Sequence, residues 1–209
     1  MKIKLTMTTE EIQFYKHEGL PQLAENLKAQ PSINQPIVFY GSSSFRLWKT
    51  VREDLGNAAI LNMGFGGSTL EACALYFDQL FKDVESPQSV FIYAGDNDLG
   101  GGQKAEDILF SFESIYRQLR FKYGEDLPIF YMSIKPSPSK DNIMHEIEKS
   151  NFLVKEAMHV LTNITYVDIF TPMLDENGKS RPDLFEDDML HMLPEGYAIW
   201  TEVLKKVLI

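Results

Sequence analysis

The feature that most constrains the fold is an alternation of short, mainly apolar β-type runs with longer helical patterns. The β-type runs lie at residues 37–40, 58–61, 90–94, 129–133 and 165–169. Apolar residues repeat at helical spacing at residues 68–81, 104–122 and 141–161, and again from Pro194 to about residue 208. This alternation predicts βαβ units, in which parallel strands are joined by right-handed helical crossovers.

The chain is long enough for one sizeable domain, and no linker divides it. Of its 209 residues, 44% are hydrophobic and 12% aromatic, which is enough for a packed core. We therefore expect a single domain over residues 1–209. Thr8 and Glu11 form a capping-box pattern, and apolar residues follow them at helical spacing. Residues 1–30 are thus expected to form an N-terminal helical segment packed on that domain.

The charge balance limits the partners of the protein. A formal net charge of −10 would repel nucleic acid and anionic membranes. The single cysteine, Cys73, cannot form an internal disulfide, which is compatible with a reducing compartment. No apolar h-region follows residues 1–5, and no apolar run approaches membrane-spanning length. We expect a cytoplasmic protein without a signal peptide, membrane insertion or a nucleic-acid partner; a homo-oligomer is compatible with the sequence.

Polar clusters follow three of the predicted strands, where each strand ends. They occupy residues 41–44, 64–68 and 95–98, and they are rich in Gly, Ser, Asn and Asp. Ligands of parallel α/β sheets bind outside the carboxyl ends of the strands. The three clusters are therefore expected to meet at one edge of the sheet.

The chain contains candidates for the parts that an activated serine needs, namely a base, a group that orients the base, and donors for an oxyanion. His191 is the candidate base, because it precedes the last helix, whereas the other three histidines lie in helical patterns. Asp188, three residues earlier, is the preferred orienting group, and Asp187 is an alternative. Gly67 can offer its backbone N–H and Asn97 its side-chain amide.

Each feature also has an ordinary structural interpretation. A serine-rich loop between a strand and a helix is usually a helix cap, and an isolated Asn is usually a turn residue. A different class of enzyme is also compatible with the acidic residues. A metal-dependent phosphoesterase could use four of these side chains, Asp96, Asp98, Asp187 and His191, and a chelator would then inhibit it.

Four ordered blocks of the chain resemble the SGNH hydrolases, also called GDSL-type esterases and lipases. The blocks are Gly-Ser-Ser-Ser at 41–44, Asn-Met-Gly-Phe-Gly-Gly at 62–67, Gly-Asp-Asn-Asp at 95–98 and Asp-Met-Leu-His at 188–191. The resemblance implies an α/β fold, a three-layer α/β/α sandwich with a flavodoxin-like five-stranded parallel sheet. Ser42 departs from the family's usual Asp, and the chain looks closest to a Gly-Ser-Ser-Ser variant subgroup.

The same resemblance implies roles for individual residues. Ser43 would be the nucleophile, and Asp188 with His191 would complete a catalytic triad. The oxyanion would be held by the backbone N–H groups of Ser43 and Gly67 and by the Asn97 side chain. No metal and no cofactor is expected to take part.

The expected activity is hydrolysis of a small-molecule carboxylic ester through an acyl-enzyme. Acetyl and other short acyl esters of an alcohol or a carbohydrate are the preferred substrates. The alternatives are a lysophospholipase or thioesterase, and a weakly active or inactive module that binds a sugar or another small molecule on the same fold. The Ser42 departure motivates the second alternative.

Overall fold

A fully parallel, five-stranded sheet forms the centre of the protein in the computed structural model, which describes residues 6–208. Residues 1–5, which entered the signal-peptide prediction, lie outside the described residues. The strands are β1 (Ile37–Gly41), β2 (Ile60–Gly64), β3 (Ser89–Tyr93), β4 (Ile129–Met132) and β5 (Ile164–Val167). Their order, β2-β1-β3-β4-β5, is flavodoxin-like, so the predicted fold is confirmed.

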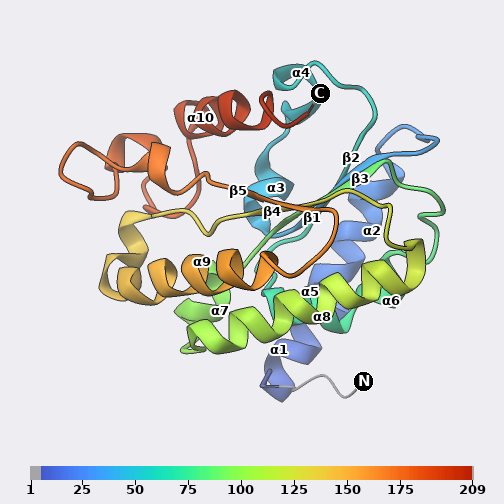
Figure 1. Cartoon of the computed structure of the whole chain (residues 1–209), viewed down its shortest axis with the longest axis horizontal. Coiled ribbons are helices and arrows are strands. Elements are labelled where there is room, and N and C mark those ends of the chain that lie inside the picture. Colours follow the sequence, from blue (N-terminus) through green and yellow to red (C-terminus); the bar gives the residue numbers. More distant parts are fainter. Residues whose placement is uncertain (1–5, 209) are drawn as a thin grey trace.

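Helices cover both faces of this sheet (Figure 1). One layer contains α3 (Ser43–Leu47), α4 (Val51–Asp54) and α10 (Pro194–Leu204). The other layer contains α5 (Leu70–Leu75), α6 (Phe77–Leu80), α8 (Ala105–Tyr123) and α9 (Met144–Met158). Further short helices lie in the connections along the chain, namely α7 (Asp96–Gly100) and the 3₁₀ helices η2 (Pro138–Ile143), η3 (Thr171–Met173) and η4 (Pro182–Leu184).

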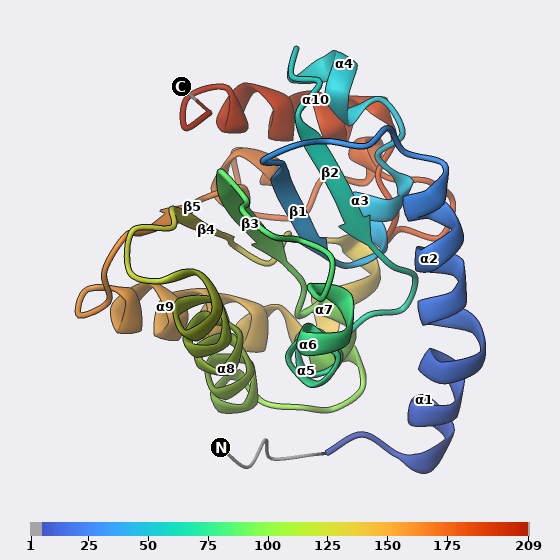
Figure 2. The same cartoon turned by 90° about the vertical axis from the view of Figure 1, so that its right-hand side faces the viewer.

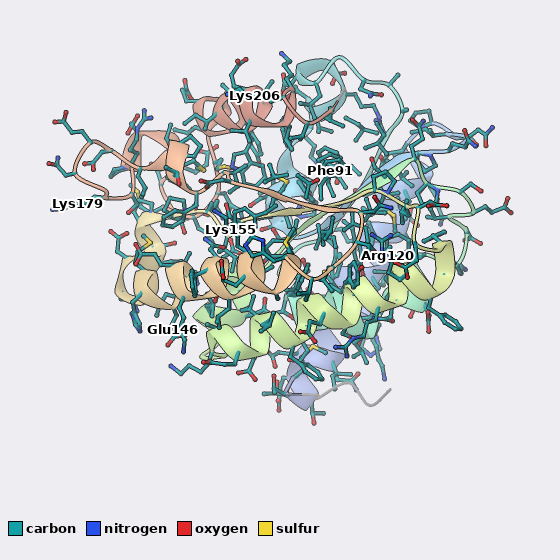
Figure 3. The ribbon with its side chains drawn as sticks, in the orientation of Figure 1. Phe91, Arg120, Glu146, Lys155, Lys179 and Lys206 are labelled. Atoms are coloured by element: carbon teal, nitrogen blue, oxygen red, sulfur yellow. The ribbon has the colours of Figure 1, made fainter. Side chains whose placement is uncertain are left out.

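The two layers enclose separate apolar cores, and the central strands contribute to both. Successive residues of a strand point to opposite faces of the sheet. Val38 and Tyr40 of β1 therefore join the core under α5 and α8, while Phe39 joins the core under α3 and α10. Phe91 of β3 belongs to this second core and lies well inside the molecule (Figure 3).

Some element boundaries differ from the predicted ones for local reasons. The second strand, predicted at 58–61, is β2 (Ile60–Gly64), because Asn57 accepts a hydrogen bond from the Ala59 N–H and forms a turn there. At its other end β2 continues through Asn62 because its backbone still pairs with β1. The helix predicted over 68–81 is two short helices, α5 and α6, interrupted at Tyr76.

The outer edge of β2 is closed by side chains. The Gln30 amide donates to the Asn62 carbonyl at 2.8 Å and accepts from the Asn62 N–H at 2.9 Å. Arg52 donates to the Ile60 carbonyl at 2.8 Å. An exposed strand edge invites pairing with another chain, and these bonds occupy the groups that such pairing would use.

The N-terminal helices run beside this edge (Figure 2). They are α1 (Thr9–Phe14), the π-helix η1 (Tyr15–Gly19) and α2 (Leu20–Lys28). The predicted capping box is present, because Thr8 and Glu11 each accept a hydrogen bond from the other's backbone N–H. Tyr15 and Leu23 are buried against the sheet's first core. Within residues 6–208, no helix has the length and apolar character needed to cross a membrane.

Candidate active site

Ser43 lies at the first position of α3, immediately after the end of β1. Gly41 ends the strand at φ +146°, and a Cβ there would lie 1.8 Å from the Tyr93 carbonyl oxygen, so only glycine fits. Ser42 is the N-cap of α3, and its hydroxyl accepts from the Ser44 N–H at 3.3 Å. The Ser42 position thus keeps a capping oxygen without a carboxylate. Ser43 is 8% exposed, with its hydroxyl facing the loop that contains His191.

His191 connects Ser43 to a carboxylate. Its Nε2 lies 3.1 Å from the Ser43 Oγ, and its Nδ1 lies 2.5 Å from the Asp188 Oδ2. The other Asp188 oxygen accepts the backbone N–H groups of Leu190 and His191, both at 2.9 Å. Met189 has φ +56°, which closes the turn between Asp188 and His191. The geometry therefore selects Asp188 over Asp187 as the partner of the imidazole.

The charge on Asp188 is stabilised by this turn. Partial burial raises the pKa of the Asp188 carboxyl, but the two backbone N–H groups and the His191 ring outweigh burial and bring the pKa below its usual range. The side chains of Asp188 and His191 are 48% and 30% exposed. The charged Asp188 carboxylate thus faces the Nδ1 of His191, and the Nε2 of the same ring faces Ser43. The side chains of Asp188 and His191 both remain accessible from solvent.

Gly67 lies on the loop after β2 and Asn97 lies in α7, and the loop is hydrogen-bonded both to Asn97 and to the end of β1. The Asn97 side-chain amide donates to the Ser68 carbonyl at 3.1 Å, and the Ser68 hydroxyl donates to the Gly41 carbonyl at 2.9 Å. Gly67 has φ +65° and is exposed. Ser43 is the first residue of α3, and the first N–H groups of a helix have no partner within it. All the predicted site residues therefore lie at the carboxyl edge of the sheet.

A polar cavity of about 310 Å³ lies beside Asn97. One wall comes from the N-terminal segment, with Thr8 and Glu11, and the other from the segment after α7, with Gly101 and Gln103. The described lining contains hydroxyl, amide and carboxylate groups and glycines but no aromatic or aliphatic side chain. This composition suits a hydroxyl-rich group better than an alkyl chain.

The sequence of the chain matches the family model for the GDSL-like lipase/acylhydrolase family over residues 34–199. The chain belongs to this family. Family membership supports an activity that hydrolyses ester bonds, and it confirms the resemblance drawn from the four sequence blocks. No functionally curated protein matches the chain in sequence.

Solved structures of GDSL-type and other esterases share this fold. A GDSL-like lipase from Bacteroides thetaiotaomicron is 21% identical, with a TM-score of 0.71 over 90% of this chain and 95% of that one. A carbohydrate esterase of family 3 from Talaromyces cellulolyticus is 16% identical, with a TM-score of 0.69 over 84% and 96%. A mutant of the acetyl-xylooligosaccharide esterase Axe2 from Geobacillus is 14% identical, with a TM-score of 0.69 over 85% and 95%.

The other acidic residues of this GDSL-like hydrolase have structural partners. Asp96 forms an ion pair with Lys135, with 2.6 Å between Oδ2 and Nζ. Asp98 accepts the backbone N–H groups of Leu70 and Glu71 at 2.8 and 3.2 Å. Across residues 6–208, no three His, Cys, Asp or Glu side chains are grouped as a metal site would require. The arrangement therefore does not support the phosphoesterase alternative.

Sequence reasoning missed two residues near the site. Lys135 is completely buried, although it belongs to a Pro- and Ser-rich segment with the signal of a surface loop. Tyr15 is one of the apolar residues that follow Thr8 and Glu11 at helical spacing, yet its hydroxyl donates to the Gly67 carbonyl at 2.8 Å. Neither contact has a local sequence signal, because the partners lie 39 and 52 residues away.

Proposed function

We propose that the protein is a carboxylic ester hydrolase that works through an acyl-enzyme on Ser43. The observation that supports this most strongly is the continuous chain of contacts from Ser43 through His191 to Asp188. An imidazole within 3.1 Å of a hydroxyl can accept its proton as the hydroxyl oxygen attacks an ester carbonyl. Asp188 orients the ring and stabilises the imidazolium that forms.

The reaction proceeds in two steps. The Ser43 oxygen bonds to the acyl carbon while the His191 Nε2 takes the serine proton, which gives a tetrahedral oxyanion. The N–H groups of Ser43 and Gly67 and the Asn97 amide donate to that oxyanion. The carbon–oxygen bond to the alcohol then breaks, and His191 gives the proton to the departing alkoxide. Water repeats the sequence with His191 as base and releases the acid and free Ser43.

The proposed substrate is a short acyl ester, such as an acetyl ester, of a polar alcohol or carbohydrate. Two observations support it. The cavity beside Asn97 is lined by polar groups, which would hydrogen-bond the hydroxyls of a sugar better than they would solvate a long alkyl chain. Two structures with the same fold are described as a carbohydrate esterase and an acetyl-xylooligosaccharide esterase.

The deciding variant is Ser43→Ala. With p-nitrophenyl acetate, the variant should lose at least about 10⁴-fold in kcat, because the nucleophile is absent. A fluorophosphonate probe should label the wild-type protein and leave Ser43→Ala unlabelled. Equal turnover by the two proteins would remove Ser43 from the reaction. A folded wild-type protein without turnover or labelling would favour a binding module on the same fold.

A panel of substrates then tests the acyl and alcohol groups. The wild-type kcat/KM should fall as the acyl chain of p-nitrophenyl esters lengthens from acetyl to octanoyl. Acetylated sugars should be cleaved with release of acetate. A preference for long acyl chains would contradict the short-acyl assignment and favour a lipase or lysophospholipase.

A further inference from the structure

The N-terminal helices lie outside the family match, which begins at residue 34. Two of their residues nevertheless contact the loop that contains Gly67. Phe14 ends α1, and Tyr15 begins the π-helix η1. The loop after β2 is therefore held in two ways: its own Ser68 donates to the Gly41 carbonyl within the matched region, and Tyr15 of the N-terminal segment donates to its Gly67 carbonyl from outside that region.

Tyr15 fixes the backbone on both sides of Ser68. Its hydroxyl donates to the Gly67 carbonyl at 2.8 Å and accepts from the Thr69 N–H at 3.3 Å. The residue is 2% exposed, and burial raises the pKa of the Tyr15 phenol well above its usual range, so the hydroxyl keeps its proton and can donate. The bond holds Gly67 in its left-handed conformation at φ +65°.

The two aromatic rings come from the junction of α1 with the π-helix η1. A π-helical turn is rare and often occurs at functional sites, because the added residue changes the direction of the side chains. Gly19 ends this π-helix, and a Cβ there would lie 3.2 Å from a Tyr15 ring carbon and 3.7 Å from a Phe14 ring carbon. Glycine at this position therefore avoids a tight contact with the Tyr15 ring.

Phe14 forms an apolar surface beside Gly67. Two of its ring carbons lie 3.3 and 3.5 Å from the point that a Gly67 Cβ would occupy. The Phe14 ring makes an edge-to-face contact with the Tyr15 ring, with 5.4 Å between the ring centroids. The residue is 37% exposed, so part of the ring can be reached from solvent. An ester held by the Gly67 N–H would lie next to this ring.

We propose that the N-terminal helices form part of the active site, with Tyr15 as a positioning residue for Gly67 and Phe14 as a specificity residue that contacts the apolar part of the ester. This inference rests on the proposed esterase function. Tyr15 acts on the transition state through the Gly67 N–H, so its loss should lower kcat. Phe14 contacts bound substrate and the transition state alike, so its loss should raise KM.

Tyr15→Phe tests the positioning role, because it removes only the hydroxyl. We expect kcat for p-nitrophenyl acetate to fall about tenfold with KM changed less than twofold, since a misplaced donor costs less than the 10²–10³-fold loss of a whole oxyanion donor. The rate of fluorophosphonate labelling should fall in parallel. Tyr123→Phe is the matched control, because the Tyr123 hydroxyl also donates to a backbone carbonyl, that of Val84, at 2.6 Å. Its kcat should stay within twofold of wild type, although this variant also loses a hydrogen bond from a tyrosine hydroxyl to a backbone carbonyl.

Phe14→Ala tests the contact with substrate. We expect KM for p-nitrophenyl acetate to rise at least fivefold while kcat stays within twofold, and Phe14→Leu should recover much of the lost affinity. Phe152→Ala is the control, because Phe152 is a more exposed aromatic residue, at 61%, on α9. Its KM should equal that of wild type.

The outcomes separate this inference from the proposed function. If wild type shows no ester turnover, the proposed function fails before any variant is compared. If wild type is active and Tyr15→Phe keeps its kcat, or Tyr123→Phe loses as much, the positioning role is wrong. An active Phe14→Ala with an unchanged KM would remove Phe14 from the substrate site.

Discussion

Two pairs of an aspartate and a basic side chain lie at the carboxyl edge of the sheet, and they differ in exposure. The side chains of Asp188 and His191 are 48% and 30% exposed, whereas those of Asp96 and Lys135 are 5% and 1% exposed. This difference in exposure determines which pair can take part in catalysis and which can only support the structure. A group that exchanges protons with substrate must be reached by it, whereas a fully buried pair can only hold the surrounding backbone in place.

The buried pair lies beneath the loops that supply the candidate oxyanion donors. Lys135 also donates to the Tyr93 hydroxyl at 3.3 Å, and Asp96 accepts the N–H of Asn97 at 3.1 Å. Burial raises the pKa of the Asp96 carboxyl, but the Lys135 ammonium outweighs burial and holds that pKa below its usual range. The Asp96 carboxyl thus stays ionised inside the protein, and its pair with Lys135 joins β3, α7 and the segment after β4.

The largest expected effect on activity is that of Asp188→Asn in the exposed pair. We expect kcat for p-nitrophenyl acetate to fall about 10⁴-fold, because the amide no longer orients and stabilises the imidazolium. The free energy of unfolding should change by less than about 1 kcal/mol, since the side chain is half exposed. Asp183→Asn is the control, because Asp183 pairs with Arg181 on the surface, and its kcat should stay within twofold. Similar losses in both variants would contradict the role of Asp188.

A change in the buried pair should lower stability more than activity. Asp96→Asn leaves the Lys135 ammonium buried without its counter-charge, so urea unfolding should show a loss of about 3–5 kcal/mol. The double variant Asp96→Asn/Lys135→Met removes both charges and should recover most of that loss. The kcat of the folded fraction should fall less than tenfold in either variant. Stability equal to wild type in Asp96→Asn would mean that the pair does not stabilise the fold.

The fold was predictable because its signal is local and repeated. Alternating apolar runs and helical patterns determine which residues can face a core, and parallel strands bring their carboxyl ends to one edge. The clusters that end β1, β2 and β3 could therefore be expected together, as could Ser43 with His191 once the last loop was placed at the same edge. The end of β2 was missed because Asn62 and Gly64 resemble a loop, and their strand conformation depends on pairing with β1.

The buried pair and the N-terminal contacts could not be predicted in this way. A lysine in a Pro- and Ser-rich segment is expected in solvent, and only the approach of Asp96 from α7 makes burial of Lys135 favourable. Tyr15 fits an apolar helical face equally well with or without a partner for its hydroxyl. Gly67, 52 residues away, is that partner, and only the folded chain brings the two together.

Asp98 is a third carboxylate at this edge, and its contribution to stability should depend on pH in the opposite direction to that of Asp188. Burial raises the pKa of Asp98 from 3.8 to about 7, because the Leu70 and Glu71 N–H groups offset burial only in part. The folded state then binds the proton more tightly than the unfolded chain. The stabilising contribution is therefore full below about pH 4 and is lost as the pH rises to about 7.

Relative to Asp98→Asn, wild type should lose a few kcal/mol of unfolding free energy between pH 4 and pH 8 in urea titrations. For Asp188, whose pKa is lowered, the contribution is present above pH 4 and is lost as the pH falls, so the wild type minus Asp188→Asn difference should change only at acid pH. Parallel stability curves for wild type and Asp98→Asn from pH 4 to 8 would mean that Asp98 titrates like an exposed carboxyl despite its burial.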